Sequence, residues 1–325
     1  MSSFPEGIQQ ATERLISWHL RRLRRRAGGR YRIAIPLEWL LSFLGAVAVI
    51  LVVNQYLFQF YVIPSGSMMD TLLVHDRISV SKLAYGVEPL PGLPKLSEGN
   101  NPKRGDIVTF RNPDYRSRGP LFDIAQRFVF MATFSLVNLD RDRSGRPAAH
   151  YLIKRVVALG GDRVRIDPVD GSMEIAPEGI GVWLPERDFK QLAGVTYRTV
   201  RLFRAPDYAR LQAATTAYVY YRAGLPVPRP DLIAVDGMPS RYDLKVFEYD
   251  GDRIEYAIHP EERAAGSRWR RFALGWYIAP GELFPMGDNR DDSRDGRYFG
   301  PVPLSLVRGK ATFRFWPPGR AGMLR

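Results

Sequence analysis

The sequence contains no cysteine, and it contains only four histidines. The absence of cysteine excludes disulfide bonds, thiolate catalysis and cysteine-ligated zinc. One of the histidines, His19, precedes the only long apolar run of the chain, which leaves few candidates for histidine-based catalysis. The sequence also shows no internal repeat of fixed period and no motif that reads RNA or DNA.

The chain is long and apolar enough to fold. Its 325 residues, 45% of them hydrophobic, allow one large domain or two modest ones. The net charge of +13 would ordinarily suggest a nucleic acid partner. Much of the positive charge precedes residue 36, where only Glu6 and Glu13 oppose it. The basic residues there are Arg14, Arg21, Arg22, Arg24, Arg25, Arg26, Arg30 and Arg32.

An apolar run over residues 37–57 follows these arginines and indicates that they flank a membrane anchor. The run carries one charge, Glu38, and matches the ~20 residues that cross ~30 Å of hydrocarbon. Lysine and arginine accumulate on the cytoplasmic side of membrane helices, and the far flank has no basic residue until Arg77. We therefore expect a basic cytoplasmic segment, 1–36, a transmembrane anchor, 37–57, and the rest of the chain outside. No nucleic acid partner is expected.

A cleavable leader is the alternative reading of this run. A leader has an apolar core of about 7 to 15 residues that ends in small residues. Here the run is longer, and its small-x-small site, Ala46-Val-Ala48, lies inside the apolar stretch. This pattern favours a retained anchor.

After the apolar run, the sequence breaks into short β-branched and aromatic runs bounded by Gly, Pro, Asn and Asp. This pattern is typical of many short strands. We expect a mainly β domain outside the membrane. Its clearest strands are 77–82, 106–111, 151–158, 163–166 and 311–316.

Two stretches differ from this pattern. Residues 121–139 have apolar side chains at helical spacing, and they predict either a membrane-surface helix or a helix that covers the β core. Residues 167–271 predict an inserted β subdomain with a helix over 207–217 and no chemical motif. The strand-like runs of this subdomain are 216–221, 232–237, 242–250 and 254–259.

Three segments carry side chains suited to chemistry. Residues 61–72 lead through Pro64 into a Ser-Gly-Ser turn, which can expose a hydroxyl beside backbone N–H groups. Residues 151–162 place Lys154 in an otherwise apolar strand, and residues 286–301 are dense in small and charged groups.

Several segments together resemble the ordered conserved boxes of bacterial type I signal peptidases. They read PSGSMMDTL, RGDIVTF, YLIKRVVALGGD, GDNRDDSRDGRYFGPVP and GKATF, and they follow an apolar run. The resemblance implies a membrane-bound serine endopeptidase that removes signal peptides from exported preproteins after Ala-x-Ala sites, without metal or cofactor. It also implies a place in the bacterial cytoplasmic (inner) membrane, with the lipid bilayer, signal peptides and the protein export machinery as partners.

The resemblance implies a division of the chain as well. A signal-peptidase-like β catalytic domain would comprise 58–114 with the nucleophile, 148–166 with the lysine, and 272–325 with the GDNR box. The inserts 115–147 and 167–271 would separate these parts, and one N-terminal transmembrane helix would precede them.

Carried over position by position, the resemblance assigns roles to residues. Ser67 falls on the nucleophile and Lys154 on the general base, Ser65 on an oxyanion donor, and Ser293 on a hydrogen-bond partner of the lysine. Asp295 and Arg297 fall on a structural ion pair. The substrate-binding positions are Tyr61, Ile63, Leu72 and Ile153. The departures from the family pattern are Asp70 and Gly160, where proline is frequent, and Asp292, where asparagine is usual.

The chemistry explains why a buried lysine is needed. A serine hydroxyl is a weak nucleophile until a base takes its proton. Lysine at its ordinary pKa near 10.4 is protonated, and burial brings catalytic lysines to roughly 7 to 8. The apolar strand around Lys154 is a setting that supplies such burial.

Other readings of the same residues remain open. His150 lies four residues before Lys154 and is the histidine available to a Ser-His-Asp hydrolase. Asp291, Ser293 and Asp295 have calcium-loop offsets, but Val302 stands where such a loop has glutamate. An anchored, inactive binding protein would retain the boxes only for folding.

Overall fold

The structure is a computed structural model, in which the chain divides into two units, Met1–Leu51 and Val52–Arg325. It describes residues 17, 18, 21, 35–86, 100–115, 118–133, 137–141, 145, 149–167, 171–201, 203, 205–227 and 244–324. Most of the basic segment 1–36 and the predicted strand 232–237 therefore lie outside the described residues.

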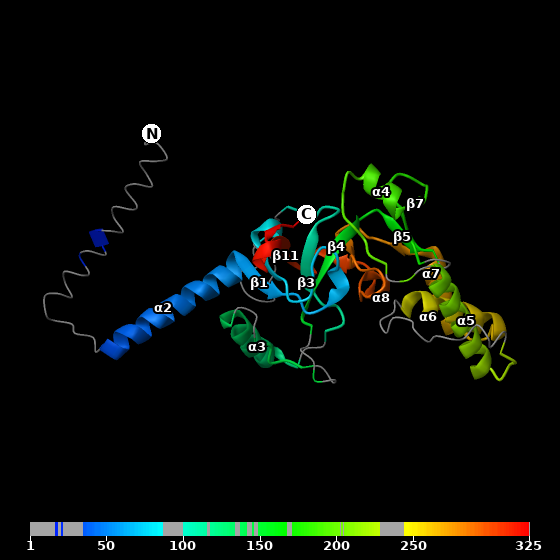
Figure 1. Cartoon of the computed structure of the whole chain (residues 1–325), viewed down its shortest axis with the longest axis horizontal. Coiled ribbons are helices and arrows are strands. Elements are labelled where there is room, and N and C mark those ends of the chain that lie inside the picture. The colour runs from blue at the N-terminus through cyan, green and yellow to red at the C-terminus, as the bar shows by residue number, and fades with distance from the viewer. Residues whose placement is uncertain are drawn as a thin grey trace. The chain divides into compact units, whose positions relative to one another are not determined.

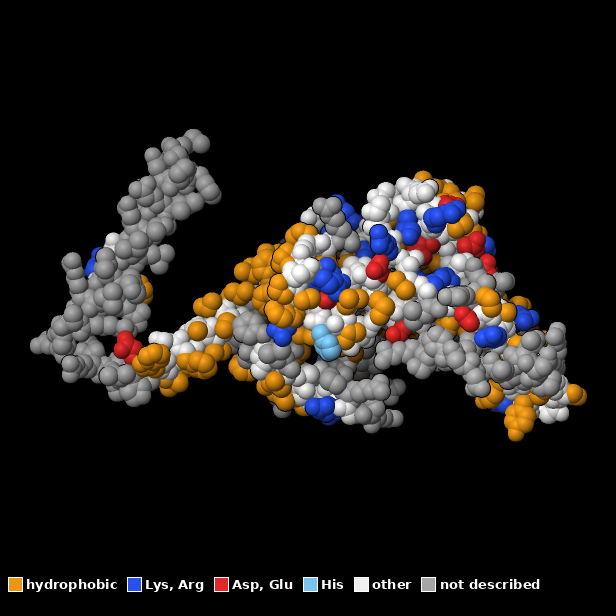
Figure 2. Space-filling view, in the orientation of Figure 1, with side chains coloured by type: hydrophobic (Ala, Val, Ile, Leu, Met, Phe, Trp, Pro, Cys, Tyr) orange, Lys and Arg blue, Asp and Glu red, His pale blue; other side chains and the backbone are white. Residues whose placement is uncertain are grey.

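The apolar run forms a helix, α2 (Ile35–Tyr56). Many of its large apolar side chains are exposed, with Trp39 at 75%, and Figure 2 shows apolar side chains along it. Among the described residues, no helix combines the length and the apolar composition that crossing a membrane requires. The predicted transmembrane anchor is not confirmed.

The second unit is built on an eight-stranded sheet, as Figure 1 shows in part, and the prediction of a mainly β fold is confirmed. The strand order is β1-β2-β11-β3-β4-β9-β10, and β12 pairs with β11. Every pairing is antiparallel. The strands are β1 (Phe58–Val62), β2 (Arg77–Ser81), β3 (Ile107–Arg111), β4 (Tyr151–Leu159), β9 (Glu282–Met286), β10 (Val302–Pro303), β11 (Val307–Trp316) and β12 (Gly322–Met323).

The centre of this sheet is buried on both faces. Residues 107–110 of β3 and 154–158 of β4 are buried without alternation, because apolar clusters cover the sheet from either side. Consecutive side chains of a strand point to opposite faces. Any polar side chain in the middle of β4 therefore lies in a dry environment, and Lys154 and Arg155 are such side chains.

A second, four-stranded antiparallel sheet follows β4 in the order β7-β6-β5-β8. Its strands are β5 (Arg163–Ile166), β6 (Met173–Ala176), β7 (Leu184–Pro185) and β8 (Trp276–Tyr277). Apolar side chains of this sheet pack with Phe284 and Met286 of β9 in one cluster. The two sheets therefore share a core next to the end of β9.

Most of the remaining described residues of 167–271 are helical, and the prediction of strands at 216–221, 244–250 and 254–259 is wrong, while residues 242 and 243 lie outside the described residues. Its helices are α4 (Glu186–Leu192), α5 (Ala205–Arg222), α6 (Leu244–Ile258) and α7 (Arg263–Leu274). Helix α5 extends the predicted helix 207–217, and it buries Tyr208, Leu211 and Thr215 on one face at spacings of three and four. Packing of this face overrides the strand preference of the local aromatic runs. Figure 1 shows α5, α6 and α7 grouped together.

The stretch 115–147, predicted as an insert, contains helix α3 (Pro120–Ala132), which covers the first part of the predicted stretch 121–139. Phe130 of α3 packs on the cluster that contains Tyr61, with the ring centres 6.3 Å apart. Ile124 and Phe128 are exposed at 63% and 51%. The helix thus covers part of the β core with one face, and contact of the other face with a membrane stays a prediction.

The remaining elements are single turns. They are η1 (Gly66–Met68), η2 (Leu83–Tyr85), α8 (Gly296–Phe299), η4 (Leu304–Leu306) and η5 (Pro318–Arg320).

Candidate active site

Ser67 lies on the turn η1, which follows β1 after an extended stretch through Pro64. The turn is held from the GDNR box, because the backbone N–H of Asn289 donates to the carbonyl of Ser67 at 3.1 Å. The side-chain amide of Asn289 donates to the carbonyl of Gly66 at 3.2 Å. The backbone around Ser67 is therefore fixed by a segment more than 200 residues away in the sequence.

Lys154 lies opposite Val108 in the middle of β4, between β3 and β9. Its side chain is only 4% exposed. Its Nζ lies 2.6 Å from Oγ of Ser67, in hydrogen-bond contact. The structure thus brings together the two residues on which the expected chemistry depends.

Burial changes the protonation of this lysine. Removal from water disfavours the ammonium and lowers the pKa of Lys154 from its ordinary value of 10.5 to about 8. The carboxylates of Asp295 and Asp288 oppose this change, while Arg297 reinforces it. Near pH 8, the amine is consequently neutral in a large fraction of the molecules.

Asp295 and Arg297 form a buried, doubly hydrogen-bonded ion pair, with N–O distances of 2.9 and 3.0 Å. Asp295 also accepts the backbone N–H of Gly287 at 3.0 Å and caps α8. Burial alone would raise the pKa of Asp295, but Arg297 and these donors hold it below its usual range. This carboxylate is thus a fixed charge close to Lys154.

Ser293 and Ser65 take no part in the hydrogen bond between Lys154 and Ser67, and their roles stay predictions. Ser293 is buried against Gly287, where an added Cβ would clash with Oγ of Ser293 and lie 2.5 Å from the carbonyl oxygen of Ser67. Among the described residues, no hydrogen bond joins Oγ of Ser293 to Lys154. Ser65 is exposed, and its side chain does not cap η1.

The four expected substrate-binding residues come together. Tyr61, Ile63 and Leu72 are buried in one apolar cluster, and the partly buried Ile153 packs against it. Ile153 precedes Lys154 on β4, so this cluster adjoins the lysine along the strand.

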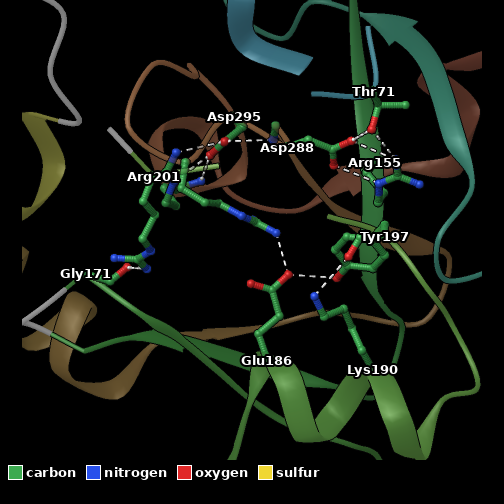
Figure 3. Close-up of polar contacts among 12 residues, drawn as sticks. Thr71, Arg155, Gly171, Glu186, Lys190, Tyr197, Arg201, Asp288 and Asp295 are labelled. Atoms are coloured by element: carbon green, nitrogen blue, oxygen red, sulfur yellow. Dashed lines mark hydrogen bonds and ion pairs between the residues drawn. The ribbon is translucent and has the colours of Figure 1, made fainter. Parts of the chain in front are cut away.

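Sequence reasoning missed a polar network on the opposite face of β4. Arg155 pairs with Asp288, and Oγ1 of Thr71 donates to Asp288 at 2.6 Å (Figure 3). The sequence held one signal of this network. Because neighbouring strand residues face opposite ways, an arginine beside Lys154 in an apolar run needs a buried partner.

The residues of the two alternative sites, a Ser-His-Asp triad and a calcium loop, have other partners in the structure. His150 has Nε2 3.2 Å from Asp140, its ring centre lies 4.2 Å from that of Tyr115, and burial lowers the pKa of this histidine. Asp291 accepts the backbone N–H of Phe203, while Asp295 is paired with Arg297. Among the described residues, no three His, Cys, Asp or Glu side chains are grouped as metal ligands.

Comparison with known proteins gives matches over most of the chain, including the expected insert 115–147. Residues 36–201 and 215–316 match the family described as signal peptidase, peptidase S26. The chain is 28% identical over 292 residues to signal peptidase I of Haemophilus influenzae, covering 87% of this chain and 72% of that protein. It is 28% identical over 287 residues to signal peptidase I of Pseudomonas fluorescens, covering 85% and 70%. It is 22% identical over 296 residues to signal peptidase I of Helicobacter pylori, covering 85% and 80%. The chain belongs to the signal peptidase family, peptidase S26.

Proposed function

We propose that this peptidase removes signal peptides from exported preproteins, with Ser67 as nucleophile and Lys154 as general base. The observation that carries the proposal is the 2.6 Å contact between Nζ of Lys154 and Oγ of Ser67, in a site where burial lowers the pKa of the lysine to about 8. Family membership and the names of the relatives support the substrate class.

The proposed reaction follows from this geometry. The neutral amine of Lys154 takes the hydroxyl proton as Oγ of Ser67 attacks the scissile carbonyl carbon. The backbone N–H of Ser67 and the hydroxyl of Ser65 donate to the resulting oxyanion, and the loss of one such donor typically costs ~3 to 4 kcal/mol. The lysine ammonium returns its proton to the leaving amine. A water molecule, deprotonated by the same lysine, then hydrolyses the acyl-enzyme and regenerates the serine.

Supporting roles are proposed for the residues around this dyad. The buried pair of Asp295 and Arg297 holds the GDNR box in shape, and Ser293 orients the lysine amine when substrate is bound. The apolar cluster of Tyr61, Ile63, Leu72 and Ile153 receives the small side chains of an Ala-x-Ala site. No metal or cofactor takes part in this scheme.

We further propose that residues 37–57 hold the protein in the bacterial cytoplasmic membrane, with segment 1–36 inside and the catalytic domain outside, near the export machinery. The exposed apolar side chains of α2 support this placement. Exposed apolar residues also gather on the second unit around β1 and β11 (Figure 2), namely Leu57, Phe58, Phe313, Phe315, Trp316 and Met323. The exposed face of α3 would rest on the same bilayer. Retention in membranes washed with alkaline carbonate tests the anchor, and release of the full chain would contradict it.

The test of the function uses the full chain in detergent and a preprotein that carries an Ala-x-Ala site. Ser67→Ala and Lys154→Ala should each reduce cleavage by at least ~1,000-fold, because each removes part of one catalytic unit. Ser305→Ala and Lys103→Ala are matched controls at exposed positions. Cleavage that survives in both active-site variants at the level of the controls would refute the mechanism.

A further inference from the structure

The second insert is attached to the GDNR box by backbone hydrogen bonds. The N–H of Val200 donates to the carbonyl of Asp288 at 2.8 Å, and the N–H of Arg290 donates to the carbonyl of Val200 at 2.9 Å. These bonds form a parallel bridge between Val200 and Asn289. A segment outside the conserved boxes is thus paired with the loop 288–291.

A side-chain contact extends this attachment. The carboxylate of Asp291 accepts the backbone N–H of Phe203 at 2.8 Å and the hydroxyl of Tyr208 at 2.9 Å. Tyr208 lies in the first turn of α5 and is buried against Phe203. The helical part of the insert is therefore connected to the loop as well.

The same loop holds the nucleophile from its other side. Asn289 donates to the carbonyls of Ser67 and Gly66, while its neighbours Asp288 and Arg290 bond to Val200. The loop thus lies between the insert and the turn that carries Ser67. The backbone position of Ser67 is therefore coupled to the position of this loop through the hydrogen bonds of Asn289.

Tyr197 of the insert packs against Arg155, which belongs to the buried polar network of Arg155, Asp288 and Thr71 (Figure 3). Its ring centre lies 4.8 Å from the guanidinium carbon of Arg155, which pairs with Asp288. A guanidinium over an aromatic face is favourable, and more so where water is excluded. The residue before Arg155 is Lys154, so Tyr197 covers the strand segment that carries the proposed base.

The position of Tyr197 is itself fixed. Its hydroxyl donates to Glu186 at 2.8 Å, and Glu186 pairs with the buried Arg290 of the loop. Lys190 donates to the carbonyl of Tyr197 at 3.1 Å and lies 4.7 Å from its ring centre. Helix α4, which carries Glu186 and Lys190, thus clamps this tyrosine against Arg155.

We propose that Tyr197, Val200, Phe203 and Tyr208 of the insert form a brace for the active site, in which Tyr197 and Tyr208 are positioning residues for Lys154 and Ser67. Tyr197 immobilises Arg155 and, through Asp288, the loop. Tyr208 immobilises the same loop through Asp291. Neither tyrosine is proposed to touch substrate, so the brace governs the rate of the chemical step and leaves substrate binding alone. The proposal rests on the proposed Ser-Lys function.

The first test replaces Tyr197 in the full-length protein and measures kcat and KM for an Ala-x-Ala peptide. Tyr197→Leu should lower kcat by ~10- to 100-fold with KM within about twofold, because small misplacements of reacting groups have effects of this size. Tyr197→Phe keeps the ring over Arg155 and should restore kcat to within about threefold of wild type. Tyr221→Leu is the matched control, because Tyr221 lies in the same insert and is 75% exposed.

A second variant, Tyr208→Phe, tests the brace if Tyr197→Leu does not fold. Tyr208→Phe removes only the hydroxyl that bonds to Asp291, and it should lower kcat by about 3- to 10-fold with KM unchanged. Its control is Tyr218→Phe at an exposed position of α5.

The outcomes separate the brace from the proposed function. If folded Tyr197→Leu and Tyr208→Phe proteins match their controls in kcat, or if only KM changes, the brace is refuted while the Ser-Lys function stands. If wild type does not cleave the peptide, or Ser67→Ala cleaves it equally well, the proposed function itself fails.

Discussion

The guanidinium of Arg155 binds both carboxylate oxygens of Asp288, at 2.8 and 2.7 Å, and the two side chains are 1% and 0% exposed. Arg155 also donates to the carbonyl of Gly105 at 2.7 Å and to Thr71 at 3.1 Å. This pair connects β4, the GDNR box and the segment after the nucleophile at one point. It is next to Lys154 but on the opposite face of the strand.

Replacement of one member of this pair should destabilise the fold. Asp288→Ala leaves the Arg155 charge buried without its partner, and such changes typically cost ~3 to 5 kcal/mol. We expect a loss of this size in the free energy of unfolding. Urea titration monitored by tryptophan fluorescence measures it.

Two further variants show whether the loss reflects the unpaired charge. The double variant Arg155→Met/Asp288→Leu should lose less stability than Asp288→Ala alone, because it removes both charges. Asp188→Asn, which breaks an exposed pair with Arg187, should leave the urea midpoint unchanged. The interpretation is wrong if Asp288→Ala unfolds at the same urea concentration as Asp188→Asn.

The activity should depend on pH through Lys154. The base must be neutral, and its pKa is lowered to about 8, so kcat/KM should rise with pH to a plateau with a midpoint of about 8. Peptide cleavage measured between pH 6 and 10 tests this. A midpoint near the ordinary lysine value of 10.5 would show that the amine is not held dry in the free enzyme.

Asp292 should tune that midpoint. Its carboxylate favours the ammonium form of Lys154 and so raises the pKa of the lysine. Asp292→Asn restores the residue usual in the family, and it should move the midpoint of the same profile to lower pH. Glu261→Gln, at a position that is 73% exposed, serves as the control for loss of a carboxylate. A midpoint that stays in place, or rises, contradicts the electrostatic role of Asp292.

The parts of the molecule that could be predicted from sequence were those fixed by local patterns. Short β-branched and aromatic runs bounded by turn residues identified the strands at 77–81, 107–111 and 151–159 within one residue. An isolated lysine in an apolar strand indicated burial, and the box order paired Lys154 with Ser67. The strands and the burial of the lysine follow from the composition of short segments, whereas the pairing of Lys154 with Ser67 came from the family resemblance.

The parts that could not be predicted depend on contacts between distant segments. The aromatic run 216–221 has the composition of a strand, yet it is helical because Tyr208, Leu211 and Thr215 bury one helix face. Nothing in the sequence around Tyr197 shows that its ring covers Arg155, because that contact exists only after the insert folds onto the GDNR box.

The burial of Lys154 should lower the free energy of unfolding of the protein at neutral pH. The pKa of its folded state, about 8, is below its ordinary value of 10.5, so the folded state disfavours the ammonium. This penalty is complete below pH 8 and disappears as pH rises from 8 to 10.5, because only the unfolded chain still binds the proton there. At ~1.36 kcal/mol per unit, the gap amounts to about 3 kcal/mol.

The uncharged variant Lys154→Met should therefore unfold at higher urea concentration than wild type at pH 7. Its advantage, up to about 3 kcal/mol, should vanish near pH 10.5. Lys103→Met, at an exposed position, controls for loss of a lysine. An advantage that is absent at pH 7, or independent of pH, would mean that the burial of this amine carries no protonation penalty.

Gly160, where proline is frequent in the family, occupies a position with no room for a side chain. An added Cβ would lie 2.9 Å from the carbonyl oxygen of Ala279 and 2.9 Å from the Cα of Pro280. Both atoms belong to the backbone that leads into β9, so the contact is relieved only if that segment moves. Overpacking of this kind typically costs ~1 to 3 kcal/mol, and Gly160→Ala should lose stability in that range. Gly181→Ala, where no atom lies within 4 Å of the added Cβ, should be as stable as wild type. Because β9 leads into the GDNR box, Gly160→Ala should also lower kcat, whereas equal urea midpoints and equal kcat in the two variants would contradict the close approach at residue 160.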